Sequence, residues 1–447
     1  MGQHAVVVGG SVAGLSAAQV LAGRFSDVTV IERDALPDGP AYRRGVPQAA
    51  HVHSLLTAGL TSLDELFPGL PDELVAKGAV PMDAGRDVLF HQLGHYRLPY
   101  DSSTRRITFS RPLLETVLRT RVERHANVTV RTAAAVDGLR MVDGRVTAVE
   151  VSGGEVLPAD LVVDASGRSS RRFTRWLESS GFPPPPTSTV KVGVGYASRI
   201  LRRRPDDLPH GKMVILSARA PVSKRFGVLF PIEGEQWMLT LGGFHHDHPP
   251  NDDEGFAAYA RSLGTTVIAD VVDRAEPLAP IVTHQFPASI RRHFERQRRL
   301  PAGYVAIGDA ICSFNPVYGQ GMSVAALEAQ ALGRCLDRVG APSARMARAY
   351  YRAAARPVRL AWWLAGSVDF LFPETSGPKP VGADLVNRYL RQVVLASHVN
   401  VDVHRVLLEV SHLVRRPAAL ARPSTVVATY RWARRSPVAA GAPVPAA

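Results

Sequence analysis

The stretch HAVVVGGSVAG at residues 4–14 decides the fold class of this chain. A short, valine-rich run is typical of a buried parallel strand. The glycines after it lead into a helix of small residues, expected from Leu15 to about Phe25. A second apolar run, VTVI at residues 28–31, ends at Glu32 and Arg33. Strand, glycine-rich turn, helix and strand in this order predict a Rossmann-like α/β domain.

The turn between the first strand and the helix is typical of a dinucleotide site. Gly9 and Gly14 match the outer glycines of G-x-G-x-x-G, while Ser11 stands at the middle position and is small enough for close backbone approach. Amides at the start of the helix can then bind a pyrophosphate. We therefore expect Gly9, Ser11, Ala13 and Gly14 to contact a dinucleotide, which this turn alone does not identify as NAD or FAD.

The end of the second predicted strand fits another part of such a ligand. The Glu32 carboxylate can accept hydrogen bonds from both hydroxyls of a ribose, and Arg33 can stack on adenine. The alternative for this region is a glycine-rich turn that only packs a helix on a sheet.

A second motif, about three hundred residues later, points to a flavin. GDA at residues 308–310 ends a predicted strand, and NPVYGQGM at residues 315–322 leads into a predicted helix. An aspartate at a strand end can hydrogen-bond a ribityl chain, and amides at a helix start can stabilise the negative charge of a reduced flavin ring. The residues expected to contact the flavin here are Asp309, Pro316, Gly319, Gly321 and Met322.

The pattern along the chain predicts a mixed α/β fold whose Rossmann-like domain is discontinuous. FPPPPT at residues 182–187 marks a change to alternating segments, which are typical of an inserted antiparallel sheet. The predicted parts are an FAD-binding domain at residues 1–75, 100–182 and 290–345, a substrate-binding sheet domain at residues 76–99 and 183–289, a C-terminal helical region at residues 346–435, and a disordered tail at residues 436–447.

The composition excludes several classes of protein. The 447 residues are 46% hydrophobic and 21% charged, which excludes disorder for most of the chain. Two cysteines, Cys312 and Cys335, are too few for a disulfide framework, so we expect a reducing, cytoplasmic location. No apolar run is long enough for a transmembrane helix, and the run at residues 5–8 is too short for a signal peptide.

The net charge of +13 is concentrated in two arginine-rich runs. Residues 413–447 carry +6 and RRHFERQRR at residues 291–299 carries +4, which together make ten of the 13 surplus charges. Neither run is interleaved with the aromatic residues of a single-strand-binding groove, so we expect solvated faces and no nucleic-acid partner. The charge can still attract an anionic or carrier-bound substrate, or hold a membrane surface in peripheral contact.

Three segments in this order, GGSVAG, VVDASGRSS and GDAICSFNPVYGQGM, resemble the single-component FAD monooxygenases of the para-hydroxybenzoate hydroxylase fold. More narrowly, YRRGVPQAAHVHSLLTAG at residues 42–59 and NPVYGQGMS resemble the bacterial polyether epoxidases of the lasalocid and monensin type, which are relatives of squalene epoxidase. The resemblance extends from the start of the chain to about residue 340.

The resemblance implies further cofactor contacts and a reaction. It makes Arg43 and Arg111 FAD contacts near the phosphates, where arginine forks suit a pyrophosphate. It implies FAD as the cofactor and O2 as a co-substrate. A flavin C4a-hydroperoxide then transfers oxygen to an alkene of a hydrophobic polyene, prenylated or polyketide substrate. NADPH or NADH is the expected electron donor, but SGRSS at residues 166–170 departs from the hydroxylase pattern. A separate flavin reductase therefore stays possible as a partner.

The sequence offers candidates for the wall of the active site but no clear general base. Tyr318, Phe230 and Trp237 are the leading wall candidates, with Val192, Val194, Leu229 and Leu239 as further apolar positions. The absence of a base favours epoxidation over phenol hydroxylation. Three alternatives stay open, namely an aromatic hydroxylase of the same fold, a non-oxygenating reductase of the geranylgeranyl reductase type, and a non-catalytic flavoprotein.

Two histidines and one cysteine also attract attention. His51 and His53 have no Cys, Asp or Glu partner at ligand spacing, so we expect a structural or flavin-proximal hydrogen-bonding role and no metal site. Cys312 is expected to be a small buried hydrophobic residue.

Overall fold

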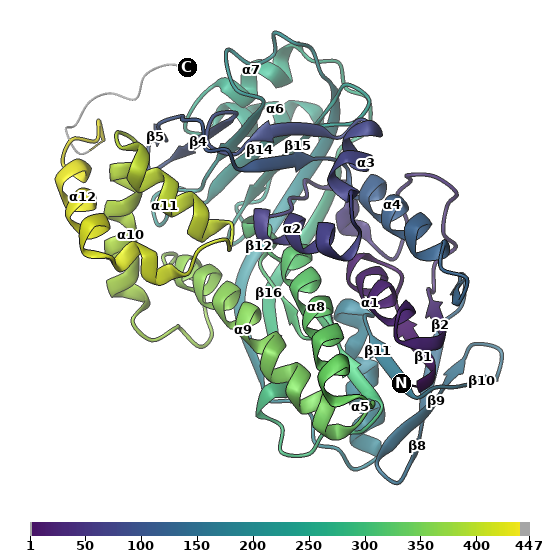
Figure 1. The fold of residues 1–447 in the computed structure, drawn as a ribbon. Helices are drawn as coiled ribbons and strands as arrows, with labels where there is room; N and C mark the ends of the chain where they lie inside the picture. Colours follow the sequence, from purple (N-terminus) through teal and green to yellow (C-terminus); the bar gives the residue numbers. More distant parts are fainter. Residues whose placement is uncertain (1, 439–447) are drawn as a thin grey trace.

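A computed structural model describes residues 2–438 (Figure 1). Within this range, a five-stranded parallel sheet has the order β17-β11-β1-β2-β7. Its strands are β1 Gly2–Val8, β2 Phe25–Ile31, β7 Val128–Arg131, β11 Leu161–Asp164 and β17 Tyr304–Ala306. Every neighbouring pair in the sheet is parallel, which confirms the predicted Rossmann-like core.

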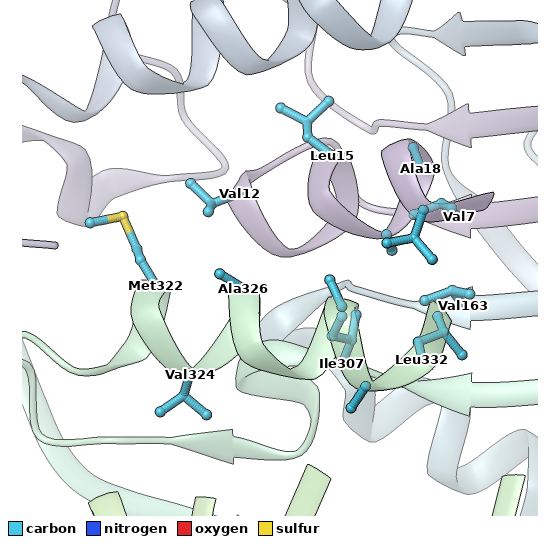
Figure 2. Packing of buried hydrophobic residues seen from close by; sticks show 14 of the residues in the cluster. Val7, Val12, Leu15, Ala18, Val163, Ile307, Met322, Val324, Ala326 and Leu332 are labelled. Atoms are coloured by element: carbon cyan, nitrogen blue, oxygen red, sulfur yellow. The ribbon is translucent and has the colours of Figure 1, made fainter. Parts of the chain in front are cut away.

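Both faces of this parallel sheet are covered, which explains the unbroken apolar runs in its strands. On one face Ala5 and Val7 pack against helices α1 (Val12–Ala22) and α8 (Gly321–Val339), as Figure 2 shows for Val7, Leu15 and Leu332. On the other face Val6 and Val8 pack beneath helix α5 (Arg171–Ser179) and a three-stranded sheet. That sheet comprises β8 Val136–Val142, β9 Arg145–Val151 and β10 Glu155–Pro158.

A second large sheet lies beside the first. In the described chain it has eight strands in the order β18-β16-β12-β15-β14-β13-β4-β5. They are β4 Val88–Gln92, β5 His95–Tyr96, β12 Thr187–Arg202, β13 Met213–Leu216, β14 Arg225–Ile232, β15 Gln236–Gly243, β16 Val282–Arg292 and β18 Cys312–Ser313. The sheet is mixed rather than purely antiparallel, because β4 pairs parallel with β13. It also crosses the predicted boundary at residue 289, since β16 continues to Arg292.

Helices complete the two units. α2 Thr57–Leu66 contacts α8, α4 Arg111–Glu123 contacts α1, and α3 Leu70–Ala76 contacts both α2 and α4. The strands β3 Val80–Asp83 and β6 Arg105–Thr108 form an antiparallel pair. α6 Asp253–Arg261 and α7 Val267–Arg274 cover one face of the large sheet. The C-terminal helices are α9 Ala344–Asp369, α10 Ala383–Ser397, α11 Val401–Ser411 and α12 Pro423–Ala433.

Several sequence expectations need correction. Helix α1 ends at Ala22, because Phe25 already begins β2 and is buried in the core. The run at residues 291–299 is not wholly solvated. Arg291 is buried against Glu295 at 2.7 Å, and buried Arg292 donates to the carbonyl oxygens of Asp309 and Ala310.

The C-terminal end of the described chain is partly ordered. Ser436 is buried, and its hydroxyl lies 2.9 Å from His398 Nδ1, so the predicted tail begins later than residue 436. Residues 439–447 lie outside the described range. No helix between residues 2 and 438 combines the length and apolarity that crossing a bilayer requires.

Candidate functional site

A cleft of about 660 Å³ opens between the parallel sheet and the large sheet. It lies at the carboxyl ends of parallel strands, where open α/β sheets place their ligands, and its size suits a cofactor and a small molecule. The predicted contact residues that line it are Gly9, Ser11, Ala13, Glu32, Arg33, Arg43, Arg111, Asp309, Pro316, Gly319, Gly321 and Met322. Residues from both ends of the chain therefore meet at one site.

At one end of the cleft, the turn before α1 presents backbone amides. Gly9 has a φ of +110°, which favours glycine. Gly14 does not line the cleft, and a Cβ there would lie 1.8 Å from the Gly9 carbonyl oxygen, so this glycine allows helix and strand to pack closely. No side chain in the described chain caps the α1 N-terminus, because the Ser11 hydroxyl donates to Glu115 Oε1 instead. The first amides of α1 are thus available to an anion.

A buried group of charges surrounds this turn. Arg43, whose side chain is 7% exposed, lies 2.9 Å from Glu32, 3.3 Å from Asp34 and 3.0 Å from Glu115. Burial lowers the pKa of Arg43, but Glu115 and Glu32 outweigh this effect and raise it above its ordinary value. Arg43 therefore stays cationic at the edge of the cleft, as a phosphate contact must.

Arg111 carries the positive charge further along the cleft. Its Nε donates to Glu115 Oε1 at 2.8 Å and its Nη2 donates to the Ser11 hydroxyl at 2.8 Å. Its Nη1 lies 3.1 Å from His53 Nε2, while His53 Nδ1 lies 2.9 Å from the His51 carbonyl oxygen. Since a carbonyl can only accept, His53 carries its proton on Nδ1 and accepts from Arg111. Burial and Arg111 lower the His53 pKa to about 3, so the ring is neutral.

Glu32 and Arg33 differ in how tightly they are held. The Glu32 carboxylate accepts from the amides of Gly10 at 2.8 Å and Asp34 at 3.0 Å. Arg33 is exposed, and its one hydrogen bond to a residue within 2–438 is to the Ser169 hydroxyl, at 3.5 Å. Glu32 is thus fixed beside the turn, and Arg33 is free to reorient over a base.

The opposite end of the cleft is formed by the segment after β17. Asp309 lies in the turn Gly308–Ala310, and burial raises the pKa of its carboxyl. Gly319 has a φ of +62°, and α8 then begins at Gly321 with no side-chain cap in the described chain. A Cβ on Gly321 would meet only Asp309 Oδ1, at 3.9 Å, so the backbone there is open to a flat ligand.

Asp369, at the end of α9, holds this segment in place. Its Oδ1 accepts from Asn315 Nδ2 and from the Tyr318 hydroxyl, both at 2.8 Å. Burial raises the Asp369 pKa to about 7. No motif predicted a role for Asp369, because the residue lies outside every recognised motif and contacts the loop only in the folded chain.

The predicted wall residues are not brought to the cleft. Trp237 is 2% exposed and donates to Asp207 in the core beneath α6 and α7. Phe230 packs with Met82 and Met213. Tyr318 turns away to Asp369. Leu229 and Leu239 pack in the same buried cluster as Trp237. Val192 and Val194 are buried in the cluster that contains Phe286. Alternation along a strand does not show which face of a sheet meets the ligand, and this is why the wall was misassigned.

The actual wall on the sheet side comes from β16 and from the loop at residues 51–54. His284 and Phe286 line the cleft together with His51, and the Arg168 guanidinium lies 4.7 Å from the centre of the Phe286 ring. Burial lowers the pKa of both His51, to about 4, and His284. Sequence reasoning missed His284 and Phe286, since an isolated strand residue carries no motif. Glu115 was also missed, although its i+4 spacing from Arg111 on a predicted helix was a usable signal.

The VVDASGRSS segment forms the floor between the two ends. Asp164 is fully buried and accepts from the hydroxyls of Ser166, Ser170 and Tyr304. Asp164 therefore shapes the turn, while Gly167 and Arg168 face the cleft. Cys312 is buried in the core, as predicted, and burial raises the pKa of its thiol.

The residues present fit a bound FAD. Two uncapped helix N-termini, those of α1 and α8, open into the same cleft from opposite ends. Arginine side chains and a ribose-compatible carboxylate surround the first, and Asp309 with an open glycine backbone lies at the second. The first end would hold the ADP part, and the second would hold the ribityl chain and the ring.

Comparisons with known proteins agree with this reading of the cleft. Residues 5–170 match the family described as FAD dependent oxidoreductase. Protein Rv3254 of Mycobacterium tuberculosis is 36% identical over 395 residues, which is 84% of this chain and 82% of that protein. A kynurenine 3-monooxygenase of Salinispora tropica is 28% identical over 79% of this chain and 77% of its own length.

Solved structures show the same fold at low sequence identity. The flavin-dependent brominase Bmp2 superposes with a TM-score of 0.65 at 16% identity, over 92% of this chain and 94% of the brominase. The shared fold extends beyond residues 5–170, because 92% of this chain is covered.

Proposed function

This chain belongs to the FAD-dependent oxidoreductase family, and we propose that it is a monooxygenase that inserts one O2-derived oxygen atom into a hydrophobic small molecule. FAD bound in the cleft supplies the redox chemistry and the activation of oxygen. The observation that carries the proposal is the division of the cleft. Ion-paired charges gather at the α1 end, while His51, His284 and Phe286, with the Arg168 guanidinium beside its ring, form the wall on the sheet side.

The chain's own residues support each part of this function. Arg43, Arg111 and the α1 amides bind the phosphates, and Asp309 orients the ribityl chain. The amides at the start of α8 favour negative charge on a reduced ring. Phe286 and Phe314 exclude water from the α8 end, which protects an oxygen-transfer reaction from wasteful release of peroxide.

The finer proposal is epoxidation of an alkene in a polyene, prenylated or polyketide intermediate of natural-product biosynthesis. Epoxidation requires orientation and shielding more than a strong base. Both imidazoles at the α8 end have lowered pKa values and are weak bases, which suits this reaction. Aromatic hydroxylation is the second candidate, and the similarity to kynurenine 3-monooxygenases favours it.

The electron donor is also part of the proposal. NADPH or NADH reduces the flavin directly, or a separate flavin reductase delivers the electrons. Anaerobic mixing of the FAD-loaded protein with each nicotinamide, followed by the loss of flavin absorbance, distinguishes these routes. Fast bleaching indicates direct reduction, and bleaching only after a reductase is added indicates a partner.

The decisive experiment uses the full chain loaded with FAD. The reduced protein is mixed with ¹⁸O2-saturated buffer and a panel of alkenes and phenols, and the products are analysed by mass spectrometry. We expect one ¹⁸O atom in an epoxide, with the phenols less reactive. Labelled phenol products alone would shift the assignment to an aromatic hydroxylase.

Two other outcomes contradict the proposal. Hydrogen peroxide without any labelled organic product, at every substrate tested, would indicate a non-oxygenating flavoprotein. Reduction of an isoprenoid double bond without oxygen would indicate a reductase of the geranylgeranyl reductase type. Free FAD with the same reductant serves as the control for uncatalysed oxidation.

A further inference from the structure

A second hollow, of about 340 Å³, lies outside the cleft. Its lining includes Arg171 and Arg175 of α5, Thr189 of β12, and Ile290 and Arg292 of β16, and we call it the basic hollow. Within residues 2–438, no residue lines both the basic hollow and the cleft. Its volume falls within the range of small-molecule sites, about 300–1,000 Å³. The basic hollow is therefore a separate candidate for a ligand.

Three arginines from two distant segments meet at the basic hollow. Arg171 and Arg175 are four residues apart on α5 and therefore lie on the same face of the helix. Arg292 is the last residue of β16. Ile290 lies on the same face of that strand, because alternate residues share a face, and it pairs with Thr189 of β12. The helix and the two strands thus direct these side chains to one place.

Arg292 is buried without an anionic partner. The residue is 6% exposed, and its Nη1 donates to the carbonyl oxygens of Asp309 at 3.3 Å and Ala310 at 3.0 Å. No carboxylate oxygen of residues 2–438 lies within 4.0 Å of its guanidinium nitrogens. Carbonyl groups accept its hydrogen bonds but do not neutralise its charge. A buried cation without a counter-ion is unfavourable, so an anion at this position would stabilise the protein.

The rest of the Arg292 guanidinium can be reached from the basic hollow. Nε and Nη2 have no hydrogen-bond partner in the described part of the chain. Both differ from the sealed, unpartnered side-chain atoms of this protein, because each exposes at least 1 Å². Since Arg292 lines the basic hollow and not the cleft, a ligand in the basic hollow can accept hydrogen bonds from these two groups.

The basic hollow combines three positive charges with no acidic side chain among the described residues that line it. Neither Arg171 nor Arg175 forms an ion pair with another residue of the described chain. Burial lowers the pKa of Arg292, Asp164 opposes this effect, and Arg171 adds to it. Arg171 is thus near enough to repel Arg292, and a multiply charged anion between the arginines would relieve this repulsion.

Other groups around the basic hollow suit a phosphate that is attached to an organic body. Thr189 is exposed, and its hydroxyl has no hydrogen bond to a residue within 2–438. The Thr187 hydroxyl, by contrast, already donates to the Pro185 carbonyl oxygen at 3.0 Å. Ile290 and Pro184 add apolar surface to the lining. Arginine forks bind phosphate oxygens through paired N–H donors, and a free hydroxyl supplies one more donor.

We propose that the basic hollow binds the phosphate group of a small phosphorylated molecule, with Arg171, Arg175 and Arg292 as its cationic contacts. A phosphate monoester carries nearly two negative charges at pH 7 and therefore offsets most of the charge of the three arginines. The phosphate belongs either to a separate ligand or to the nicotinamide donor, because the ribose 2′-phosphate of NADPH has the same chemistry. The basic hollow lies outside the cleft, so the inference does not depend on the proposed oxygen transfer.

Calorimetric titration of the FAD-loaded chain with AMP, adenosine and inorganic phosphate tests the proposal. FAD occupies the phosphate-binding end of the cleft, and an unchanged flavin spectrum shows that it stays bound. We expect AMP to bind at least about tenfold more tightly than adenosine, which lacks the phosphate. Inorganic phosphate should compete with AMP. Binding of AMP with release of FAD would place the nucleotide in the cleft and overturn the proposal.

Variants locate the bound phosphate. The double variant with Arg171→Ala and Arg175→Ala changes two exposed residues, and we expect it to weaken AMP binding at least about tenfold. Arg292→Gln should weaken AMP binding to a similar extent, and if this variant does not fold, the double variant decides. Arg388→Ala is the matched control, because it removes an exposed arginine of α10, and AMP affinity should stay within about twofold.

The oxidised nicotinamides, which do not reduce the flavin, distinguish the two sources of the phosphate. A preference for NADP⁺ over NAD⁺ in the wild type, abolished in the double variant, would assign the site to the 2′-phosphate of the electron donor. Equal binding of both, with AMP still bound, would assign it to a separate phosphorylated ligand. Absence of binding of AMP, inorganic phosphate and NADP⁺ at millimolar concentrations overturns the proposal, as does unchanged AMP affinity in the double variant.

Discussion

The two ends of the cleft are built on opposite principles. At the α1 end, Arg43 and Arg111 are fixed by carboxylates, and the charges are buried and paired. At the α8 end, Asp369 and Asp309 have raised pKa values, and neutral imidazoles line the wall. Paired charges keep the arginines of the α1 end cationic, whereas burial disfavours ionisation of the aspartates and imidazoles at the α8 end. Substitutions at the two ends should therefore fail in different ways.

The largest expected effect is on stability at the α1 end. Arg43→Ala leaves Glu32 and Glu115 buried with less compensation, which we expect to destabilise the chain by about 3–5 kcal/mol. Urea unfolding of the protein without FAD measures the loss. Arg33→Ala, which removes an exposed arginine from the same region, is the matched control and should change stability by less than about 0.5 kcal/mol. Equal effects of the two substitutions would contradict the paired-charge description.

The glycines at the two helix starts give the next comparison. Gly14→Ala places a Cβ 1.8 Å from the Gly9 carbonyl oxygen. We expect the free energy of unfolding to fall by about 2–3 kcal/mol and FAD binding to be lost. Gly321→Ala meets its nearest atom at 3.9 Å, so its fold should be unaffected while flavin affinity falls. Thermal unfolding and FAD titration of both variants check this. Comparable stability losses would show that the two turns are packed alike.

The raised Asp369 pKa predicts a contribution to the pH dependence of stability that originates at the α8 end. Its folded pKa of about 7 lies above the unfolded value of 3.8, so the folded state binds the proton more tightly. Stability from this group is fully present below pH 3.8 and is lost as the pH rises towards 7. Between pH 5 and pH 7 the loss is about 2 kcal/mol.

Asp369→Asn tests this dependence while keeping an oxygen that accepts from Asn315 and Tyr318. Relative to the variant, the wild type should lose about 2 kcal/mol of unfolding free energy between pH 5 and pH 7. Parallel profiles would mean that Asp369 is ionised in the folded protein at acidic pH.

The smallest effect is expected from a single ligand contact. Asp309→Ala removes the carboxylate assigned to the ribityl chain and should weaken FAD binding about tenfold, with little change in the stability of the protein without FAD. Equilibrium titration followed by flavin fluorescence measures the change. Unchanged affinity would remove Asp309 from its assigned role.

Some residues of the cleft could be predicted from the sequence and others could not. Motif residues such as Gly9, Glu32 and Asp309 were found from sequence, because backbone turns and strand ends impose local residue types. The wall was not found. Phe286 and His284 lie on β16 of the large sheet and line the cleft, whereas Trp237 of the same sheet packs in the core beneath α6 and α7.

By itself, the sequence determined the parallel sheet, the glycine-rich turn and the motif residues that line both ends of the cleft, because each depends on short-range steric and hydrogen-bonding requirements. The tertiary structure alone decided which charges pair around Arg43 and how Asp369 fixes the loop after β18. These features join residues that are far apart in the chain, and no local pattern encodes a contact whose partner is placed by packing.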